Sequence, residues 1–272
     1  MKPVDLHHGA ASEIGHVRKV NEDSFLVAPP VFVVADGMGG HSGGDVASRI
    51  VVEEFARLAE EGYDPRRGAE HVAGALSRAQ ARIVEFAEAQ RGEHPRWHAG
   101  TTCVAAVLVE DEGSTKWLLT NLGDSRIYSF NDGDLSQISV DHSVVQELIE
   151  AGEITTLEAA THPERHVITR ALGSSEGVRP DFFLLPLTAA ERLLLCSDGI
   201  TGLIDDATIA DILDRVDDPR DAADALVKAA LDAGGLDNAT ALVVDVVGLV
   251  HDARYDSARQ RASLEDKLGA RP

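Results

Sequence analysis

Four hydrophobic runs in this chain each carry an aspartate at one edge, where the run meets a loop. The aspartates are Asp36 after VFVVA, Asp124 after LLTNLG, Asp198 after LLLCS and Asp237 before NATALVVDVV. Each run is typical of a buried strand, and rigid strands hold the carboxylates at their ends in place. Such carboxylates, with glycine beside several of them, suit hard divalent cations such as Mg²⁺ or Mn²⁺. The chain is therefore expected to build a metal centre on a β core, which favours a hydrolytic function.

The composition limits what the chain can bind. Its 272 residues are 44% hydrophobic, enough to fill the core of one large domain, which we place at residues 1–250. The formal net charge of −21 disfavours nucleic acid and anionic lipid as partners, because both are polyanions. No hydrophobic run approaches the roughly 20 residues that span a bilayer. Cys103 and Cys196 lie inside strand-like runs and are expected to be buried thiols, so we expect a reducing, cytoplasmic setting.

Strand-like and helix-like stretches alternate unevenly along the chain. The strand-like runs, several of them separated by polar turns, are 25–35, 101–110, 116–122, 126–130, 184–187, 192–197 and 239–247. Helical periodicity occurs in four stretches that form two pairs of neighbours along the chain. The first pair is 45–61 and 68–91, and the second is 205–216 and 219–233. Successive strands interrupted by helix pairs do not fit a regular βαβ alternation. They predict an α+β fold with a mainly antiparallel β core covered by helix pairs.

The segment 141–172 breaks this pattern. It contains two short helix candidates, a His-Pro break and little strand signal. We interpret it as a compact helical insertion over the surface, a type of segment that is often mobile and functional. An ordinary helical connector is the alternative. Residues 251–272 form a charged tail without a strand pattern, and we assign it no role.

A polar cluster, RKVNED, precedes the first of the long hydrophobic runs. Its Arg18 offers a planar fork of donors that matches two oxygens of a phosphate group, and it stays charged at any relevant pH. A lone arginine in a loop is usually a surface residue. Its closeness in sequence to Asp23 and Asp36 makes the alternative interpretation, in which it holds an anion, equally well supported.

Six short motifs occur in an order and spacing that resemble one family, the bacterial metal-dependent serine/threonine protein phosphatases of type 2C (PPM family). The motifs are Arg18-x-x-Asn21-Glu22-Asp23, Asp36-Gly37-Met38-Gly39-Gly40, Gly100-Thr101-Thr102, Gly123-Asp124-Ser125-Arg126, Ser197-Asp198-Gly199 and Gly235-x-Asp237-Asn238. Each alone is weak, but six in order are very specific. The resemblance covers roughly residues 5 to 248 and implies a β-sandwich of two antiparallel sheets, flanked by helix pairs in α-β-β-α layers, with a flap at 141–172.

The resemblance also implies roles for individual residues. Asp36 is similar to the carboxylate that bridges two metal ions, with the backbone carbonyl of Gly37 completing the shell of one of them. Asp198 and Asp237 resemble ligands of the other ion. The remaining implied roles are a third, weaker ion at Asp124 with Asp198, direct or water-mediated metal contacts from Glu22 and Asp23, and a grip on the substrate phosphate by Arg18. Two Mn²⁺ or Mg²⁺ ions are thus expected per active site.

These groups predict direct hydrolysis of phosphoserine and phosphothreonine. Two cations bridged by Asp36 and a water would lower the pKa of that water, which would attack a phosphate held by Arg18 in line. No activated serine or cysteine is needed, and neither Cys103 nor Cys196 is followed at the sixth position by an arginine. Eukaryotic members carry a histidine where this chain has Met38. His41 and His142 are candidate proton donors to the leaving group, although a structural role is favoured for each.

Three functions remain open at this stage. The leading one is an active protein phosphatase whose partners are phosphorylated proteins, in kinase-linked signalling by dephosphorylation, acting as a monomer. The second is a catalytically silent, phosphatase-like regulatory or binding module, which the complete set of carboxylates disfavours. The third is a metal hydrolase of small phosphorylated molecules, because fold and motif do not determine substrate.

Overall fold

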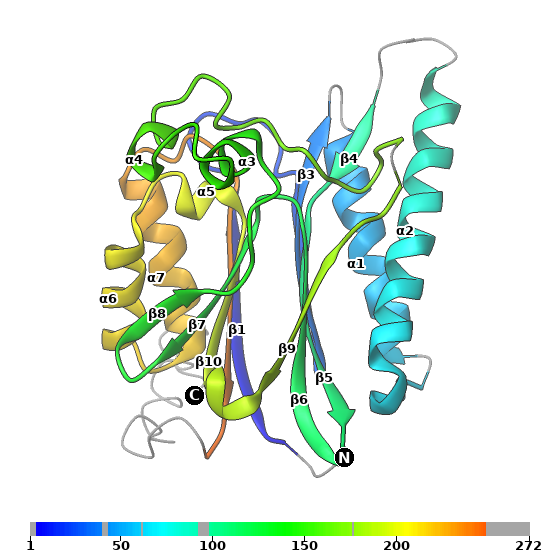
Figure 1. Ribbon diagram of the computed structural model, residues 1–272, viewed down its shortest axis with the longest axis vertical. Coiled ribbons are helices and arrows are strands. Elements are labelled where there is room, and N and C mark those ends of the chain that lie inside the picture. Colours follow the sequence, from blue (N-terminus) through cyan, green and yellow to red (C-terminus); the bar gives the residue numbers. More distant parts are fainter. Residues whose placement is uncertain (1–3, 40–42, 61, 92–97, 176, 249–272) are drawn as a thin grey trace, which may run out of the picture.

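The chain folds into two antiparallel sheets that face each other, with helices on both outer sides (Figure 1). The computed structural model describes residues 4–248, apart from 40–42, 61, 92–97 and 176. The predicted tail at 251–272 and His41 therefore lie outside the described residues. The four layers confirm the predicted α+β fold class.

The first sheet contains five strands in the order β1-β11-β10-β7-β8, all paired antiparallel. Their bounds are β1 (Leu6–Glu13), β7 (Arg126–Asn131), β8 (Asp134–Gln137), β10 (Arg192–Cys196) and β11 (Ala239–Val246). The strand β11, which lies between β1 and β10, is buried along its whole length, so both of its faces are covered. This explains why its sequence is a continuous hydrophobic run rather than an alternating one.

The second sheet follows the order β2-β3-β5-β6-β9, and β4 pairs with the end of β3. The bounds are β2 (Asp23–Ala28), β3 (Val31–Gly39), β4 (Ala99–Thr101), β5 (Cys103–Asp111), β6 (Ser114–Leu122) and β9 (Asp181–Pro186). Alternate residues of β3 enter different cores. Phe32 and Val34 pack between the sheets, whereas Val31 and Val33 pack toward the helices. The register of β3 is thus fixed by burial on both sides.

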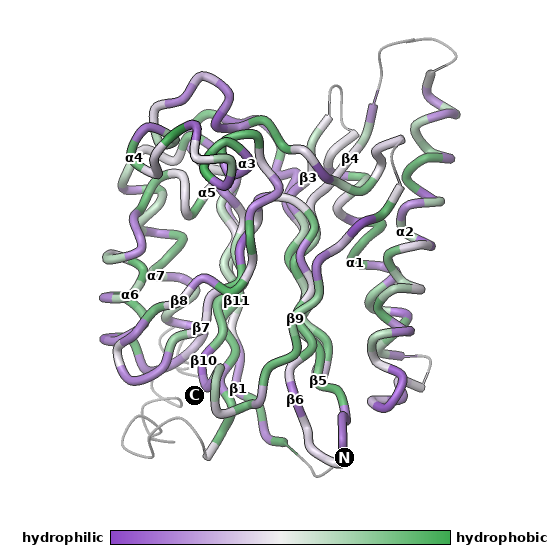
Figure 2. Tube along the Cα trace, viewed as in Figure 1, coloured by the Kyte–Doolittle hydropathy of each residue, from purple (hydrophilic) through white to green (hydrophobic). Residues whose placement is uncertain are grey.

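Two helix pairs cover the outer faces of the sheets. α1 (Gly44–Glu60) and α2 (Gly68–Arg91) share a hydrophobic core with the second sheet, and α6 (Asp206–Arg215) and α7 (Pro219–Asp232) share one with the first. In Figure 2 the central strands are coloured mainly as hydrophobic, whereas the outer helices alternate along their turns. α7 begins where its sequence predicts, because the Asp218 side chain accepts a hydrogen bond from the Arg220 amide and Pro219 occupies the first turn.

Some elements differ from the sequence prediction. The run 25–35 is two strands, β2 and β3, because Pro29 and Pro30 lie in the turn that reverses the chain between them. The strands β1, β4 and β8 were not predicted, since each is short or weakly hydrophobic. The two short helices expected within 141–172 are present as α3 (Val144–Glu150) and α4 (Thr156–Ala159). In Figure 1 they lie at the same end of the sandwich as α5 (Asp198–Thr201).

Two smaller predictions concern the cysteines and the membrane. Cys103 and Cys196 are free thiols, both fully buried, and burial raises the pKa of each to about 12. They are therefore inert core residues, as expected. Among the described helices, none combines the length and the hydrophobicity that crossing a bilayer requires.

Candidate metal centre

Asp36 and Asp23 lie opposite each other on paired strands. They are partners in the antiparallel register of β2 and β3. The sequence suggested that Asp36 ends its strand, but β3 continues to Gly39. Thr102 fixes its backbone: the Asp36 amide donates to the Thr102 hydroxyl (3.0 Å), and the Thr102 amide donates to the Asp36 carbonyl (2.9 Å). The carboxylate of Asp36 is thus carried by a rigid piece of sheet.

Gly37 is the next residue on β3 and is tightly packed. Its amide donates to the Glu22 carbonyl at 3.2 Å. A Cβ at this position would lie 2.2 Å from the carbonyl oxygen of Gly44 and 2.5 Å from that of Glu22. Only glycine allows the backbone to pass here, next to Asp36.

Asp198 and Asp237 come from the first sheet. β10 ends at Cys196, and Asp198 opens α5 directly after Ser197, the N-cap of that helix. Asp237 precedes β11 and lies in a loop that Asn238 ties to the N-terminal segment. The Asn238 side chain accepts from the Glu22 amide (2.9 Å) and donates to the carbonyls of Ile14 (2.9 Å) and Val20 (3.0 Å). Residues more than 210 positions apart are thereby brought to one place.

Asp124 occupies the turn after β6 and is 92% buried. The turn depends on Gly123, whose φ of +113° lies in the region that favours glycine and which packs against Thr102. His142 holds this turn from the other side. Its Nδ1 accepts from the Gly123 amide (3.1 Å), and the His142 amide donates to the Gly123 carbonyl (2.9 Å).

The carboxylates interact strongly with one another. Burial, followed by the charges of Asp23, Asp198 and Asp124, holds the pKa of Asp36 well above its usual value. Burial raises the pKa of Asp23 to about 6 and that of Asp124 to about 7, with Asp198 adding to both. Burial and then the charge of Asp237 raise the pKa of Asp198, which is also hydrogen-bonded to Asp36. The five predicted aspartates therefore form one electrostatic cluster.

The donor set of this cluster fits hard divalent cations. It consists of carboxylate oxygens, and Oδ1 of Asp23 and Oδ1 of Asp124 are buried without a hydrogen-bond partner among the described residues. Buried, unpartnered oxygens whose charges repel one another are stabilised by a bound cation. No three acidic, histidine or cysteine side chains in the described ranges already surround one common point.

Arg18 lies at the edge of the cluster and is its cationic member. Its Nη2 donates to Oδ2 of Asp237 at 2.6 Å, and 48% of its side chain is exposed. Partial burial opposes the charge, but Asp237, Asp36 and Glu22 outweigh it and raise the pKa of Arg18. Burial, opposed by Arg18, also raises the pKa of Glu22. Arg18 is thus a permanently charged, partly open donor beside the aspartates.

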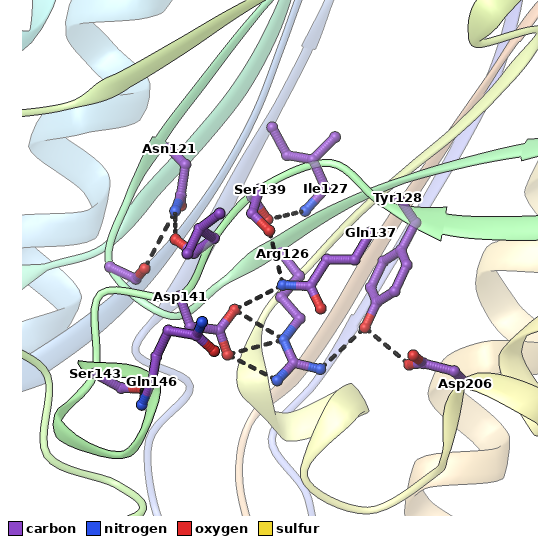
Figure 3. A network of polar contacts seen from close by, with 12 residues as sticks. Asn121, Arg126, Ile127, Tyr128, Gln137, Ser139, Asp141, Ser143, Gln146 and Asp206 are labelled. Carbon is purple, nitrogen blue, oxygen red and sulfur yellow. Dashed lines mark hydrogen bonds and ion pairs between the residues drawn. The ribbon is translucent and has the colours of Figure 1, made fainter. Parts of the chain in front are cut away.

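The segment 141–172 is anchored at both ends. At its start, Nε and Nη2 of Arg126 donate to the two carboxylate oxygens of Asp141 (2.9 and 2.7 Å), and its Nη1 donates to the Tyr128 hydroxyl (3.0 Å), as Figure 3 shows. Tyr128 in turn donates to Asp206 of α6 (3.0 Å). At its end, Leu172 and Thr101 exchange two backbone hydrogen bonds (3.0 and 3.1 Å). Between these anchors it passes over the end of the sandwich that carries α5 (Figure 1).

His142, a candidate proton donor, is buried and engaged on both ring nitrogens. Besides the contact of Nδ1 with Gly123, its Nε2 lies 3.2 Å from Oδ2 of Asp181 and 3.2 Å from Nη1 of Arg170. It holds the base of the segment against β9 and the Asp124 turn. This supports the structural role that the sequence favoured.

All the predicted aspartates, together with Glu22, Gly37 and Arg18, thus lie at one end of the sandwich. The sequence did not predict the residues that support them, among them Ser12, Thr240 and the pair of Arg126 with Asp141. Their side chains act on neighbours that are distant in sequence. Only their position beside the six motifs, as for Arg126 and Thr240, was a signal that could have marked them.

A family model described as protein phosphatase 2C matches residues 16–233, most of the chain. This chain belongs to the protein phosphatase 2C family. The matched range includes Arg18, Asp36, Asp124 and Asp198 and ends shortly before Asp237. The predicted family is thereby confirmed.

Two curated relatives of this family member are named as phosphatases. The serine/threonine protein phosphatase PstP of Mycobacterium tuberculosis (strain CDC 1551 / Oshkosh) is 37% identical over 244 residues, covering 89% of this chain and 45% of that protein. The serine/threonine phosphatase stp of Listeria welshimeri is 34% identical over 253 residues, covering 88% of this chain and 96% of the relative. The chain therefore spans about half of the first relative and nearly all of the second.

Solved structures of the family share the fold. The crystal structure of the M. tuberculosis phosphatase PstP/Ppp matches with a TM-score of 0.77 and 36% identity, over 90% of this chain and 99% of that one. Stp1 from Staphylococcus aureus matches with a TM-score of 0.80 and 32% identity, over 90% and 96%. The catalytic domain of PstP in complex with two manganese ions matches with a TM-score of 0.75 and 35% identity, over 90% and 100%.

Proposed function

We propose that this chain is a metal-dependent protein phosphatase that hydrolyses phosphoserine and phosphothreonine with two Mn²⁺ or Mg²⁺ ions. The observation that carries the proposal is the cluster of aspartates from both sheets with Arg18 at its edge. Relatives named as serine/threonine phosphatases, and a similar catalytic domain that holds two manganese ions, support it. The phosphatase domain is assigned to residues 1–250, with a flap at 141–172 and a tail of no assigned role at 251–272.

The proposed metal ligands are the members of the cluster. Asp36 is assigned the bridging position, with the Gly37 carbonyl beside it, and Asp198 and Asp237 the other positions around the pair of ions. Asp124 with Asp198 is assigned a third, weaker ion. The remaining acidic residues, Glu22 and Asp23, are assigned direct or water-mediated contacts. The buried, unpartnered oxygens of Asp23 and Asp124 support both of the assignments made to those two residues.

Bound cations would supply an activated water and would neutralise charge that develops on the phosphoryl oxygens. The residues of the protein would position the substrate phosphate and the ions. Arg18 presents a charged fork beside Asp237 and is half-open to solvent, so it can receive two oxygens of a phosphate monoester. The sheets fix Asp36 and Asp198 in place, which keeps a bound phosphate aligned for in-line attack.

The proton for the leaving group is not assigned to His142. That residue is buried, and both of its ring nitrogens have neighbours within hydrogen-bonding distance. Met38, which stands where eukaryotic members have a histidine, has no ionisable group. We assign this proton to a water at the site.

Phosphate release from a phosphothreonine peptide tests the proposal. The purified protein should release phosphate in millimolar Mn²⁺ or Mg²⁺ and should stop when the ions are chelated. A phosphotyrosine peptide and a small sugar phosphate serve as substrate controls, and slower turnover of both is expected. A protein that binds Mn²⁺ but prefers the sugar phosphate would favour the small-molecule hydrolase. A protein without phosphate release would refute the proposed activity.

The biological setting follows from the same proposal. We infer that the substrates are phosphorylated proteins of kinase-linked signalling, and that the chain works in the cytoplasm as a monomer. Comparison of the phosphoproteome in cells with wild-type protein and with an Asp36→Asn variant would identify the substrates. Unchanged phosphoserine and phosphothreonine levels would contradict this inference.

A further inference from the structure

A chain of hydrogen bonds between the two sheets ends on the carboxylate of Asp23. Oδ2 of Asp23 accepts from the Thr240 hydroxyl at 2.6 Å and from the Ser197 hydroxyl at 2.8 Å. Thr240 and Ser197 are both fully buried. Thr240 lies on β11 of the first sheet and Ser197 directly follows β10 of that sheet, whereas Asp23 begins β2 in the second. The carboxylate is therefore held from the opposite sheet by two hydroxyl groups.

The direction of these hydrogen bonds is determined by donor counting. A hydroxyl has one hydrogen, and an ionised carboxylate can only accept. The Thr240 hydrogen is used on Asp23, so Ser12 must donate in the contact between the Ser12 and Thr240 hydroxyls (2.7 Å). Nδ2 of Asn21 donates to Ser12 at 2.9 Å, and Oδ1 of Asn21 accepts from the Asp23 amide at 3.1 Å. The side-chain donors of Asn21, Ser12 and Thr240 therefore all point toward the carboxylate of Asp23.

Ser197 is fixed in the same way. Its hydroxyl oxygen accepts from the Thr240 amide at 3.0 Å, which leaves its single hydrogen for Asp23. Two hydrogens thus converge on Oδ2, while Oδ1 is buried and has no hydrogen-bond partner among the described residues. Asp23 is the register partner of Asp36. Among the neighbouring charges, that of Asp23 contributes most to the raised pKa of Asp36. The free oxygen consequently belongs to a carboxylate that is immobilised next to Asp36.

We propose that Thr240 is a positioning residue, supported by Ser12, that holds Asp23 with Oδ1 available to a bound cation or to one of its waters. The inference rests on the proposed function, because it assigns the role through the metal centre. The hydroxyl groups of Thr240 and Ser197 both donate to Oδ2, which leaves Oδ1 to bind the ion. Groups that orient a metal-binding residue in this way typically change metal affinity about 10- to 100-fold when they are removed.

The test is Mn²⁺ affinity, measured by isothermal titration calorimetry on the full chain. Thr240→Val keeps the shape of the side chain but removes the hydroxyl, and it should weaken Mn²⁺ binding by about 10- to 100-fold. Thr240→Ser restores the donor and should bind within about threefold of wild type, a margin well below the loss expected for a missing positioning group. Thr120→Val is the matched control, because Thr120 is a buried strand threonine whose hydroxyl has no partner among the described residues. It should bind Mn²⁺ as the wild type does.

Kinetics separate positioning from a purely structural role. At saturating Mn²⁺, Thr240→Val should regain most of the wild-type turnover with an unchanged KM for the phosphopeptide. The reason is that the substitution raises only the Mn²⁺ concentration that the enzyme needs. Should that variant fail to fold, Ser197→Ala removes the second donor and is expected to weaken Mn²⁺ binding in the same way. Wild-type affinity in a folded Thr240→Val protein, or in Ser197→Ala if it alone folds, would overturn the inference.

The wild-type protein distinguishes this failure from failure of the proposed function. If the wild type neither binds Mn²⁺ nor releases phosphate, the proposed function is wrong and the positioning role falls with it. If the wild type does both and the hydroxyl variants bind Mn²⁺ equally well, only the positioning role is wrong.

Discussion

Arg18 and Asp237 are 219 positions apart in sequence, yet Nη2 of Arg18 lies 2.6 Å from Oδ2 of Asp237. The arginine is in a loop before β2, and the aspartate is in the loop before β11. Asn238 joins the two loops by hydrogen bonds to Ile14, Val20 and Glu22. The proposed phosphate-binding cation and a proposed metal ligand are therefore parts of one rigid corner of the protein.

Replacement of Arg18 should affect substrate binding more than metal binding. Hydrogen bonds between a charged donor and a phosphate contribute about 1.5–3 kcal/mol, so Arg18→Ala should raise KM for a phosphopeptide roughly 10- to 100-fold. Mn²⁺ affinity should not fall, because the substitution removes a positive charge from the cluster. Arg18→Lys is the control. Its KM should lie between those of the wild type and Arg18→Ala, since lysine keeps the charge but lacks the planar fork. An unchanged KM in Arg18→Ala would contradict the phosphate-binding role.

Asp36→Asn should abolish turnover and leave the fold intact. The amide cannot serve as a bridging anionic ligand, and we expect a loss of at least about 100-fold in kcat, comparable to the removal of one group that stabilises a transition state. In chelator, the same variant should unfold at a higher temperature than the wild type, because one member of a repelling cluster becomes neutral. Phosphate release and thermal unfolding measure the two effects. Near-normal turnover would refute the bridging role.

The stability of the metal-free protein should fall as the pH rises from 5 to 8. The pKa values of Asp23 (about 6) and Asp124 (about 7) are raised above the ordinary aspartate value of 3.8, so their protonated forms are favoured in the folded state. Their stabilising contribution is fully present below pH 3.8, falls as the pH rises above that value, and is gone once the pH passes about 6 for Asp23 and about 7 for Asp124.

Thermal unfolding in chelator, repeated at each pH, measures this loss. Asp124→Asn is the control and should flatten the decline near pH 7. Saturating Mn²⁺ should remove the decline, because the ion binds the ionised carboxylates. A metal-free wild type that becomes more stable between pH 5 and 8 would show that the pKa values of these carboxylates are not raised in the folded protein.

A buried ion pair in the first sheet should be important for stability but not for chemistry. Arg192 and Asp245 are almost fully buried, with Nε to Oδ1 at 2.7 Å and Nη2 to Oδ2 at 2.8 Å. Asp245→Asn leaves a buried guanidinium without its counter-charge and should lower the free energy of unfolding by about 3–5 kcal/mol. Asp211→Asn breaks the exposed pair of Asp211 with Arg215 and should cost no more than about 1 kcal/mol. Equal losses in urea denaturation would contradict the expected importance of burial.

Much of the fold could be predicted because its strongest signals are local. α2 has the predicted bounds, and α6 and α7 agree within one residue at each end, since helical periodicity and N-terminal aspartates mark them. The strands buried on both faces, such as β5 and β11, appear as continuous hydrophobic runs. β1 was missed because seven of its eight residues are only partly buried or exposed and its sequence, LHHGAASE, is polar; pairing with β11 is what makes it a strand.

The residues proposed for the site could be named from the sequence, but the residues that hold them in place could not. The aspartates stand in motifs with glycine, which a sequence displays directly. Thr240, Ser12 and the pair of Arg126 with Asp141 act through contacts between elements, and hydrogen-bond partners 15 to 228 positions apart leave no periodic signal. The position of Asp36 inside β3 was likewise hidden, because pairing with β4 extends that strand beyond its hydrophobic part.

The most direct test of the account is the location of manganese in crystals of this protein grown with Mn²⁺, by anomalous diffraction. The account predicts strong peaks among the carboxylates of Asp36, Asp198 and Asp237, and their loss in crystals of Asp36→Asn. Manganese bound only elsewhere, or the same peaks in the variant, would contradict the central claim that these side chains form one cation site.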